Sequence, residues 1–442
     1  MNDSSGNASG AVHAQRRARL AAAIGKGIAV IPTAPERIRN RDAHYPYRFD
    51  SYFYYLSGFR EPEAVLVIIG GDAPRSILFC REKNLEREIW DGYRHGPEAA
   101  REVFAFDEAY PITELDQRMP DLLADREALH VHLGEDPAWD GRVLGWVNVL
   151  RGRARAGVAA PAAIHDVRGL LDEMRLSKDE RELALMRRAG TISAAAHRAA
   201  MAAAKPGATE YEIEALLLHE FRRSGAQAPA YTSIVAGGAN ACVLHYVENS
   251  APLADGDLLL IDAGCELDGY AADITRTFPV NGRYSGPQRA VYELVLAAQA
   301  AAISAVKPGA RWNEPHDAAV KVLAQGFIDL KLLSGPLDAV LEQESYRQFY
   351  MHRTGHWLGL DVHDAGDYKR GGQWRELQPG MVLTVEPGCY IRPAPGVPEA
   401  FFNIGIRIED DALVTSGGCE LLTAEAPKAV AEIEAWMREH RR

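Results

Sequence analysis

Two stretches of the 442-residue sequence repeat one pattern, and they decide the fold of its second half. Leu253 to Gly264 reads LADGDLLLIDAG, and Leu377 to Gly388 reads LQPGMVLTVEPG. In both stretches a turn with glycine leads into a short apolar strand, which ends in a carboxylate, one further residue and glycine. Asp262 and Glu386 hold the same position in the repeat. The repeat favours a duplicated half-domain whose strand ends meet at one centre. Chance similarity between two buried strands is the alternative.

A second carboxylate belongs with Asp262. Asp262 ends the strand LLLID, and Asp273 lies in the next strand, YAADITRTF. In a hairpin centred on residues 267 and 268 the two would lie opposite each other on one face, about 5 Å apart. Such a pair is repulsive unless positive charge lies between, and a metal ion would supply it. Arg276 is a poor alternative partner, because it is three residues from Asp273 and points to the opposite face.

Glu386 and Glu409 repeat this theme. Glu386 closes the strand MVLTVE, and Glu409 lies in the strand IGIRIED. A glutamate within a β-branched strand is out of place unless it is paired or binds a metal. Arg407 shares the face of Glu409 at two residues' distance and could be that partner, so the residues leave both interpretations open.

Three histidines follow one another between these carboxylates. His352 and His356 are four residues apart, like the helical zinc motif H-E-x-x-H. The match fails because Arg353 stands where glutamate is needed, and nearby glycines disfavour a helix. His363 comes soon after. A lone histidine is usually structural, but three within twelve residues indicate a site.

Four carboxylates and a histidine exceed the needs of one metal ion. Oxygen-rich coordination favours hard ions such as Mn²⁺, with Co²⁺ or Zn²⁺ possible. Carboxylates that bridge imply two ions about 3.5–4 Å apart, which together lower the pKa of a bridging water, present a hydroxide and polarise a carbonyl. The pattern therefore predicts hydrolysis of an amide bond.

Composition excludes several other classes of function. The chain is 47% hydrophobic and 25% charged, as in ordinary globular proteins, and its length suggests two domains. A net charge of -12 argues against nucleic-acid and anionic-membrane partners. No stretch approaches the ~20 apolar residues that span a bilayer. The Ala-rich run after residue 16 is better explained by a first helix and strand than by a signal peptide, which leaves the cytoplasm as the expected location.

The five cysteines are odd in number and widely spaced, without a C-x-x-C pair. A disulfide framework or zinc ribbon is therefore not expected, and we interpret the cysteines as reduced, mostly buried side chains.

The chain divides into three parts. Residues 1–12 are rich in Asn, Ser and Gly, which predicts a disordered tail. Residues 13–175 predict an α/β domain with strands at 64–69, 76–80 and 129–133. Residues 176–442 predict an α+β domain. Its first helix opens with Ser177-Lys178-Asp179-Glu180, similar to a capping box, and further helices follow two Lys-Pro-Gly turns.

The sequence resembles the pita-bread (creatinase/aminopeptidase) metallopeptidases, and among these the bacterial aminopeptidase P (Xaa-Pro aminopeptidase) group. The resemblance runs from about residue 30 to 425. It is carried by LHYVEN at 244–249, LLLIDAGCELDGYAADITRTFPVNG at 258–282, FYMHRTGHWLGLDVHD at 349–364, LQPGMVLTVEPG at 377–388 and GIRIEDD at 405–411. It implies a creatinase-like N-terminal domain and a pita-bread catalytic domain that releases the N-terminal residue in front of a proline.

By this resemblance five residues bind two Mn²⁺ ions in each subunit. Asp262 would bind one ion, Asp273 and Glu409 would bridge both, and His356 and Glu386 would complete the second. Glu386 would also take a proton from the attacking water.

The same resemblance assigns the surroundings of the metals. His245 and His363 would stabilise the substrate at the scissile bond. His352 and Tyr231 would contact the substrate, with His352 in the proline pocket. Arg407 would orient the bridging carboxylates.

The N-terminal part resembles the family through RDAHYPYRFDSYFYYLSGFREPEAVLV and EIWDGYRHGP. This implies a homo-oligomer, a dimer or tetramer, in which Trp90 and Asp42 of one subunit reach the active site of another. The stretch YKRGGQWRE at 368–376 departs from the family pattern, so either Arg370 or Arg375 could be its substrate-side arginine.

Other functions are possible on the same fold. A prolidase, which cleaves only dipeptides ending in proline, shares the five ligands, and Trp90 favours the aminopeptidase. Methionine aminopeptidases do not need so long an N-terminal domain, and creatinase-like members lack these ligands. A non-catalytic binding module would have lost ligands that this chain keeps.

Overall fold

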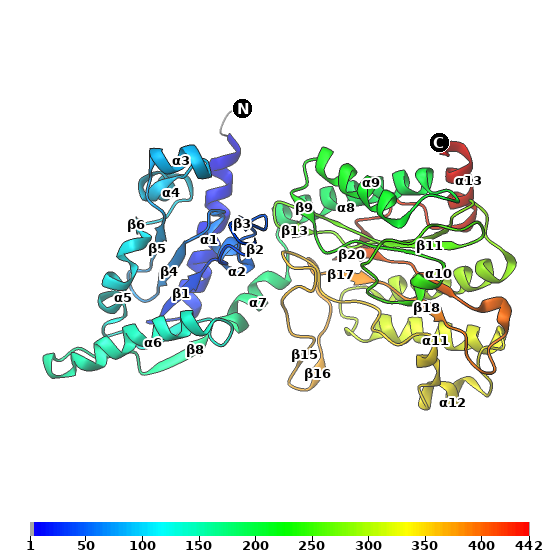
Figure 1. The fold of residues 1–442 in the computed structure, drawn as a ribbon. Helices are drawn as coiled ribbons and strands as arrows, with labels where there is room; N and C mark the ends of the chain where they lie inside the picture. Colours follow the sequence, from blue (N-terminus) through cyan, green and yellow to red (C-terminus); the bar gives the residue numbers. More distant parts are fainter. Residues whose placement is uncertain (1–3, 442) are drawn as a thin grey trace. The chain divides into compact units, whose positions relative to one another are not determined.

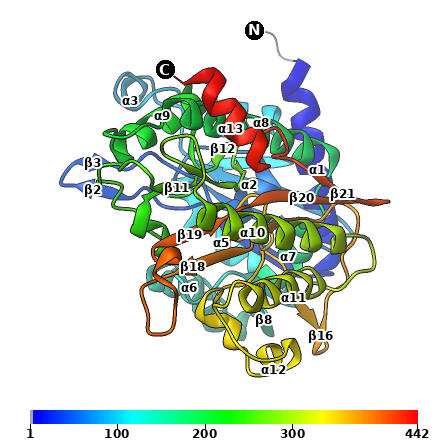
Figure 2. The ribbon, with the colours of Figure 1, turned by 90° about the vertical axis from the view of Figure 1, so that its right-hand side faces the viewer.

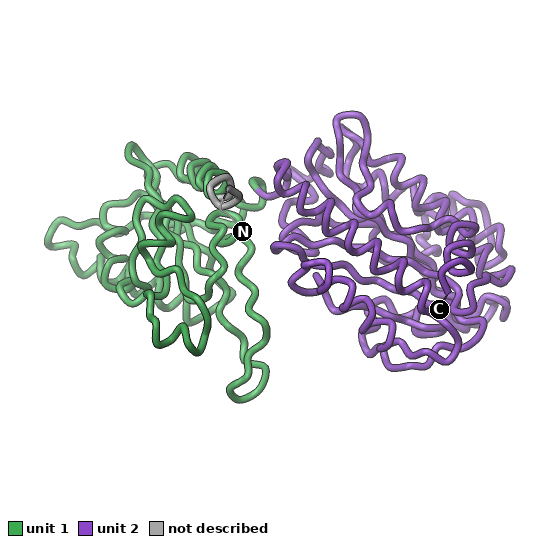
Figure 3. The backbone as a smooth tube through the Cα atoms, turned by 90° about the horizontal axis from the view of Figure 1, so that it is seen from above, with its two compact units in different colours: residues 1–174 green, residues 175–442 purple. Residues whose placement is uncertain are grey.

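The computed structural model describes residues 4–441, which form two compact units (Figure 3). Unit 1 is Met1–Met174 and unit 2 is Arg175–Arg442, so the division lies beside the boundary that the sequence indicates. Across residues 4–441, no helix combines the length and the apolar character that crossing a membrane requires.

Unit 1 alternates strands and helices, which are labelled in Figure 1. In chain order its elements are α1 (Ser4–Ala23), β1 (Ile28–Pro32), β2 (Ile38–Asn40), β3 (Ala43–His44), α2 (Ser51–Ser57), β4 (Val65–Ile69), β5 (Arg75–Cys80), α3 (Leu85–Asp91), α4 (Gly96–Val103), β6 (Glu108–Pro111), α5 (Leu115–Leu123), β7 (Ala128–Val131), α6 (Pro137–Gly152), β8 (Ala163–Asp166) and α7 (Arg168–Leu176), which crosses the boundary.

A six-stranded mixed sheet organises unit 1, in the order β6-β5-β4-β1-β7-β8. Strand β4 pairs antiparallel with both β1 and β5, whereas β5 with β6, β1 with β7 and β7 with β8 pair in parallel. One face buries Val30, Val67 and Val131 against α5 and α6, while α1 and α2 contact the other face. The predicted α/β domain and its three predicted strands are therefore confirmed.

The predicted N-terminal tail is partly wrong. Residues 1–3 lie outside the described residues, but the chain is helical from Ser4 onward. The helix is held by polar contacts at its centre, because His13 and Arg16 bond the carbonyl of Tyr55 and Arg17 bonds that of Leu56. These carbonyls end α2, where they lack helical partners and favour cationic donors.

Unit 2 contains the remaining elements. They are α8 (Glu180–Ala203), α9 (Glu210–Arg223), β9 (Ala228–Pro229), β10 (Ile234–Gly237), β11 (Leu258–Asp262), β12 (Cys265–Leu267), β13 (Tyr270–Ala271), β14 (Thr275–Pro279), α10 (Gly286–Ala305), α11 (Glu314–Asp329), α12 (Leu337–Glu342), β15 (Lys369–Arg370), β16 (Gln373–Trp374), β17 (Val382–Val385), β18 (Gly388–Ile391), β19 (Ile404–Arg407), β20 (Asp410–Thr415), β21 (Gly418–Leu421) and α13 (Val430–His440).

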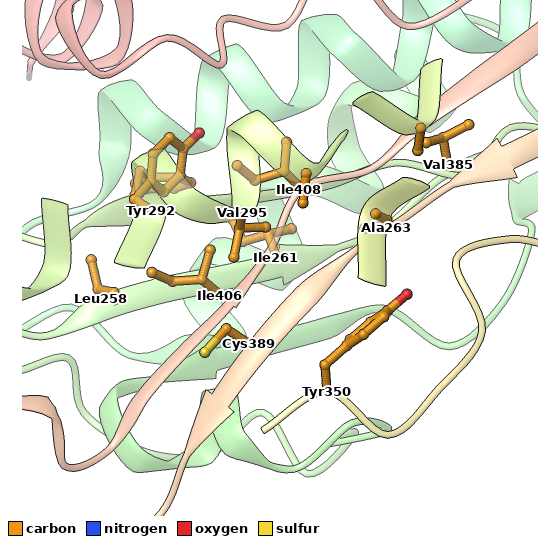
Figure 4. Packing of buried hydrophobic residues seen from close by; sticks show 14 of the residues in the cluster. Leu258, Ile261, Ala263, Tyr292, Val295, Tyr350, Val385, Cys389, Ile406 and Ile408 are labelled. Carbon is orange, nitrogen blue, oxygen red and sulfur yellow. The ribbon is translucent and has the colours of Figure 1, made fainter. Parts of the chain in front are cut away.

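Helices cover the strands of unit 2 and share one core with them. Helix α8 packs on β12 and β13, and α10 packs on β17, β18 and β19. Helix α9 pairs with α8, and α11 pairs with α10 (Figure 2). Figure 4 shows Ile261 of β11, Ile406 of β19 and Val295 of α10 within this core, and none of them is exposed to solvent. The cysteines are free thiols, four of them buried, as predicted.

The start of α8 differs from the sequence prediction by two residues. Asp179, not Ser177, is the N-cap, and it forms the capping box with Glu182. Ser177 pairs with Met381, and the Lys178 amide donates to the carbonyl of Gly380. This pairing, about 200 residues away in sequence, keeps the chain extended and delays the helix.

Two glycines test whether the repeated stretches need the same turn. Gly256 and Gly380 hold equivalent positions and have φ of +88° and +89°. We expect Gly256→Ala to destabilise unit 2 by about 1–2 kcal/mol, because only the backbone strain opposes it. Gly380→Ala should cost more, since its Cβ would lie 3.2 Å from the Lys178 carbonyl oxygen. Urea unfolding measures both values.

Gly145→Ala is the matched control. Gly145 lies inside α6 with open space around it and without a positive φ, so alanine there should stabilise by up to about 1 kcal/mol. A neutral Gly256→Ala variant would show that the left-handed turn is not required.

Candidate active site

The two repeated stretches open two long hairpins, and each hairpin is interrupted once. In the first, β11 pairs with β14 and β12 with β13 in one continuous register. In the second, β17 pairs with β20 and β18 with β19 in the same way. Asp262 ends β11, and the other carboxylates, Asp273, Glu386 and Glu409, lie in the interruptions. All four therefore project where the sheet hydrogen bonds stop.

The predicted register of the first hairpin is wrong by two residues. Asp262 lies opposite Thr275, not Asp273. The turn is the pair Asp268-Gly269, with φ of +53° and +86°, which is the sequence and geometry of a two-residue type I′ turn. Because the register is shifted by an even number of residues, Asp262 and Asp273 still lie on the same face of the hairpin. The Tyr231 hydroxyl oxygen lies 2.6 Å from Oδ1 of Asp262 and 2.6 Å from Oδ1 of Asp273, so it contacts both.

A cavity of about 1330 Å³ in unit 2 contains nearly every residue that the sequence singled out. The predicted residues among those that line it are Tyr231, His245, Asp262, Asp273, His352, His356, His363, Glu386, Arg407 and Glu409. Trp90 lies in unit 1 and is 80% exposed. A second cavity, of about 530 Å³, lies in unit 1 beside α1 and contains no histidine.

Three of these side chains converge tightly. Asp273, His356 and Glu409 each offer one ligand atom, and these atoms lie within 4.8 Å of one another. His356 Nε2 is 3.4 Å from Asp273 Oδ2 and 3.7 Å from Glu386 Oε1. Its Nδ1 lies 2.9 Å from the carbonyl of Trp357, a contact that would leave Nε2 free to bind a metal ion.

The carboxylates around His356 have too little positive charge beside them to offset their mutual repulsion. Burial and the neighbouring carboxylates raise the pKa of Glu386 to about 7 and the pKa of Glu409 well above its usual range. Burial also raises the pKa of Asp262, despite the Arg407 guanidinium. Burial acts against the charge of His356, but its hydrogen bond to Asp273 raises the histidine pKa to about 9. Divalent cations would relieve this repulsion, so the residues present fit a metal site.

Arg407 contacts a different carboxylate from the one expected. Its Nη2 donates to Asp262 Oδ2 at 2.7 Å, and its Nε donates to the Thr275 hydroxyl. Thr275 in turn donates to Glu409 Oε2 at 2.7 Å. Arg407 therefore orients Asp262 directly and reaches Glu409 only through Thr275. Arg276 points away and bonds Asp410, as the alternation predicts.

The remaining histidines surround the cluster. His352 Nε2 lies 2.9 Å from the Tyr390 hydroxyl, and burial together with Arg407 lowers the His352 pKa to about 3. The rings of His363 and His356 meet edge to face with centroids 4.3 Å apart. His245 lines the same cavity. The ring nitrogens of these histidines can form hydrogen bonds with a bound peptide.

Comparison with known proteins agrees with this geometry. Residues 184–416 match the model of metallopeptidase family M24, and residues 13–132 match the aminopeptidase P N-terminal domain. The chain belongs to metallopeptidase family M24. Its sequence is 46% identical to the Xaa-Pro aminopeptidase of Haemophilus influenzae over 96% of each chain.

Solved structures of this family have the same fold. The aminopeptidase PepP of Pseudomonas aeruginosa superposes with a TM-score of 0.96 at 50% identity, covering 98% of both chains. A zinc-substituted Escherichia coli aminopeptidase P in complex with product gives 0.96 at 44% identity, covering 98% of this chain and 99% of that one. The resemblance to aminopeptidase P and the two-domain pita-bread fold are confirmed.

Sequence reasoning missed several residues that support this M24 site. Asp411 is buried, and its carboxylate accepts the backbone N–H of Asp273 at 3.1 Å. Tyr390 joins His352 to Arg407 through its hydroxyl. The adjacent acidic residues of GIRIEDD were a signal for Asp411, because consecutive buried charges need partners. Nothing local in the sequence indicates Tyr390.

The substrate-side arginine question also has a structural answer. Arg375 is buried and donates to the Asp367 carbonyl, and Arg370 lies on the exposed hairpin β15–β16. Neither is among the described residues that line the cavity, whereas Arg353 and Lys369 are.

Asp364 anchors the loop that carries His363. Its carboxylate lies between two buried cations, 2.5 Å from Arg175 and 2.9 Å from Lys178. Its backbone N–H donates to the Trp357 carbonyl at 2.9 Å. Burial opposes the charge of Asp364, but Lys178 and Arg175 overcome it and lower the pKa of the carboxyl group.

We expect Asp364→Asn to destabilise the protein by about 3–5 kcal/mol at neutral pH, because two buried cations lose their counter-charge. A lowered folded-state pKa means that this stabilisation is present above the unfolded pKa of ~3.9 and is lost as the pH falls through the folded value. The deficit of the variant should therefore shrink in acid. Asp361→Asn is the control: Asp361 bonds the same Arg175 but is 44% exposed, so it should cost under about 1 kcal/mol. Equal deficits for the two variants would contradict the anchor.

Proposed function

We propose that this chain is a Xaa-Pro aminopeptidase, which releases a single N-terminal residue from peptides with proline in second position and uses two divalent metal ions. The observation that carries the proposal is the convergence of four carboxylates and His356 in one cavity, where the pKa of three carboxyl groups is raised. The similarity to the Xaa-Pro aminopeptidases of Haemophilus influenzae and Escherichia coli supports the substrate class.

The metal set follows from the donors. Asp262, Asp273, His356, Glu386 and Glu409 would hold the two ions. Oxygen-rich ligands favour Mn²⁺, and Co²⁺ or Zn²⁺ remain possible. When bound, two such ions would polarise the scissile carbonyl and make a water molecule more acidic.

The remaining residues bind, orient and move protons. Glu386 faces the cavity and would accept the proton of the attacking water, then return it to the proline nitrogen as the bond breaks. His245 and His363 would donate hydrogen bonds to the carbonyl oxygen as it gains charge. His352 would line the proline pocket. The hydroxyl of Tyr231 is engaged by Asp262 and Asp273, so its ring is the part left to contact substrate.

Assembly into a homo-oligomer is part of the proposal. Helix α3 and its following loop expose Leu85, Ile89, Trp90 and Tyr93, each at least 65% exposed. Large apolar side chains gathered on one short helix are typical of a protein interface. This supports a dimer or tetramer in which Trp90 reaches the active site of another subunit. Asp42, which directly precedes β3, would reach the same site. Location in the cytoplasm stays a prediction from the sequence.

Metal removal tests the proposal first. Chelation should abolish hydrolysis of Xaa-Pro peptides, and Mn²⁺ should restore it. Asp273→Asn and Glu409→Gln should each lose bound metal, because a neutral amide neither balances nor bridges two cations well. Glu293→Gln, on the exposed face of α10, should keep metal and activity. Metal content by mass spectrometry also separates an enzyme from a non-catalytic binding module. Full activity in metal-free protein would refute the two-metal mechanism.

Substrate length tests the aminopeptidase against the prolidase alternative. The cavity exceeds the roughly 300–1,000 Å³ of small-ligand sites, which leaves room for a peptide beyond the proline. We expect tri- and longer peptides to be cleaved at least as well as Xaa-Pro dipeptides. Trp90→Ala should weaken cleavage while the metal content is unchanged, since the indole would pack on the proline ring. Cleavage of dipeptides alone would establish a prolidase instead.

A further inference from the structure

One wall of the cavity carries two cations stacked on a single indole. The ammonium of Lys369 lies 4.1 Å from the ring centroid of Trp374, and the guanidinium carbon of Arg353 lies 5.7 Å from the same ring. Both distances are within the range of cation–π attraction. All three side chains line the cavity that contains the carboxylate cluster.

The backbone fixes this arrangement. Lys369 and Trp374 are direct cross-strand partners in the hairpin β15–β16, so their side chains share a face. The two residues between the strands, Gly371 and Gly372, have φ of +55° and +78°, as a type I′ turn requires. Figure 1 shows this hairpin projecting from the layers of unit 2. Arg353 comes from a different segment, directly after His352.

Among the described residues, neither cation has a counter-ion. Within residues 4–441, no ion pair joins Arg353 or Lys369 to a carboxylate. Asp367 also lines the cavity, but the contact it makes there is through its carbonyl, with Arg375. The lining contains five carboxylates and the cations Arg353, Lys369 and Arg407. Two divalent ions would turn this balance positive, which favours an anionic guest.

The direction of the substrate decides which part of it meets these cations. An aminopeptidase removes one residue, so the free ammonium of the peptide lies inside the site and the chain after the proline extends toward solvent. Arg353 and Lys369 are exposed, and Arg353 follows the proposed proline-pocket residue His352. An ammonium would be repelled there, whereas a downstream carboxylate would be attracted.

We propose that Arg353, Lys369 and Trp374 form a subsite that binds a carboxylate in the peptide segment after the proline. This inference rests on the proposed function and adds a preference for acidic substrates. The indole holds both cations in place, so little side-chain freedom is lost when the carboxylate binds.

The test compares cleavage of matched peptides by the metal-loaded protein. The peptides Ala-Pro-Glu-Ala, Ala-Pro-Gln-Ala and Ala-Pro-Lys-Ala, all with C-terminal amides, differ in one charge. We expect kcat/KM for the Glu peptide to exceed that for the Gln peptide by roughly three- to tenfold, and the Lys peptide to be the poorest. Higher salt should reduce the ratio, because exposed charges are screened.

Two further peptide arms locate the carboxylate. Ala-Pro-Gln-Glu-amide moves the acidic side chain one residue further from the proline. Ala-Pro-Gln is compared as the free acid, whose only carboxylate is the C-terminal one, and as the neutral amide. A preference in any of these pairs supports the subsite and names the source of the carboxylate.

Variants assign the preference to the two cations. Lys369→Gln and Arg353→Gln should each lower the Glu-to-Gln ratio, and Lys369→Glu should shift the preference toward the Lys peptide. Asp367→Asn should raise the ratio, because a competing carboxylate is removed. Lys321→Gln, an exposed change of the same charge on α11 outside the cavity, should leave the ratio unchanged.

Equal kcat/KM for the charged and neutral peptides, with Xaa-Pro cleavage intact, would overturn the subsite alone. A ratio that persists in Lys369→Glu would also overturn it. Failure to cleave any Xaa-Pro peptide would instead overturn the proposed function, and this inference with it.

Discussion

Four carboxyl groups gathered in one cavity, two of them buried and two half-buried, are the constraint on which the rest of unit 2 depends. An unpaired buried charge is costly, and the protein supplies only part of the compensation. Arg407 faces Asp262, and His356 lies beside Asp273, but within residues 4–441 the carboxylate of Glu409 accepts its hydrogen bond from the neutral hydroxyl of Thr275. The surplus negative charge has to be balanced by bound cations, so the same arrangement that costs stability in the empty site creates affinity for metal ions.

A second, fully paired layer of charge lies behind this cavity. Arg276 donates to the carbonyl of Glu409 and to the carboxylate of Asp410, which Lys428 also contacts. These cations hold the pKa of Asp410 down at about 2 despite its burial. The contrast with the cavity is informative: Asp410, which does not line the cavity, has two cationic partners, whereas Glu386 and Glu409, which line it, have a raised pKa.

The sequence predicted the composition of the site better than its geometry. Residue types and two-residue alternation were enough to select Asp262, Asp273, Glu386 and Glu409, because those signals are local. The register of the first hairpin also has a local signal, because Asp268-Gly269 is a strong turn sequence. The predicted centre of the turn nevertheless lies one residue too early in the chain. Contacts between distant segments had no such signal: Arg407 reaches Asp262 across 145 residues, and Asp364 reaches cations almost 190 residues away.

The two hairpins are copies in topology but not in chemistry. The first contributes two aspartates and the second two glutamates, so the carboxylates of the second pair lie one methylene further from the backbone. If Asp273 and Glu409 bridge two ions, the ions would differ in their unshared ligands. One would have Asp262 on a short, stiff side chain, and the other would have His356 and Glu386, whose side chain is longer and more adaptable. Filling would then be sequential, and a molecule carrying a single ion would be a defined half-loaded species rather than a damaged one.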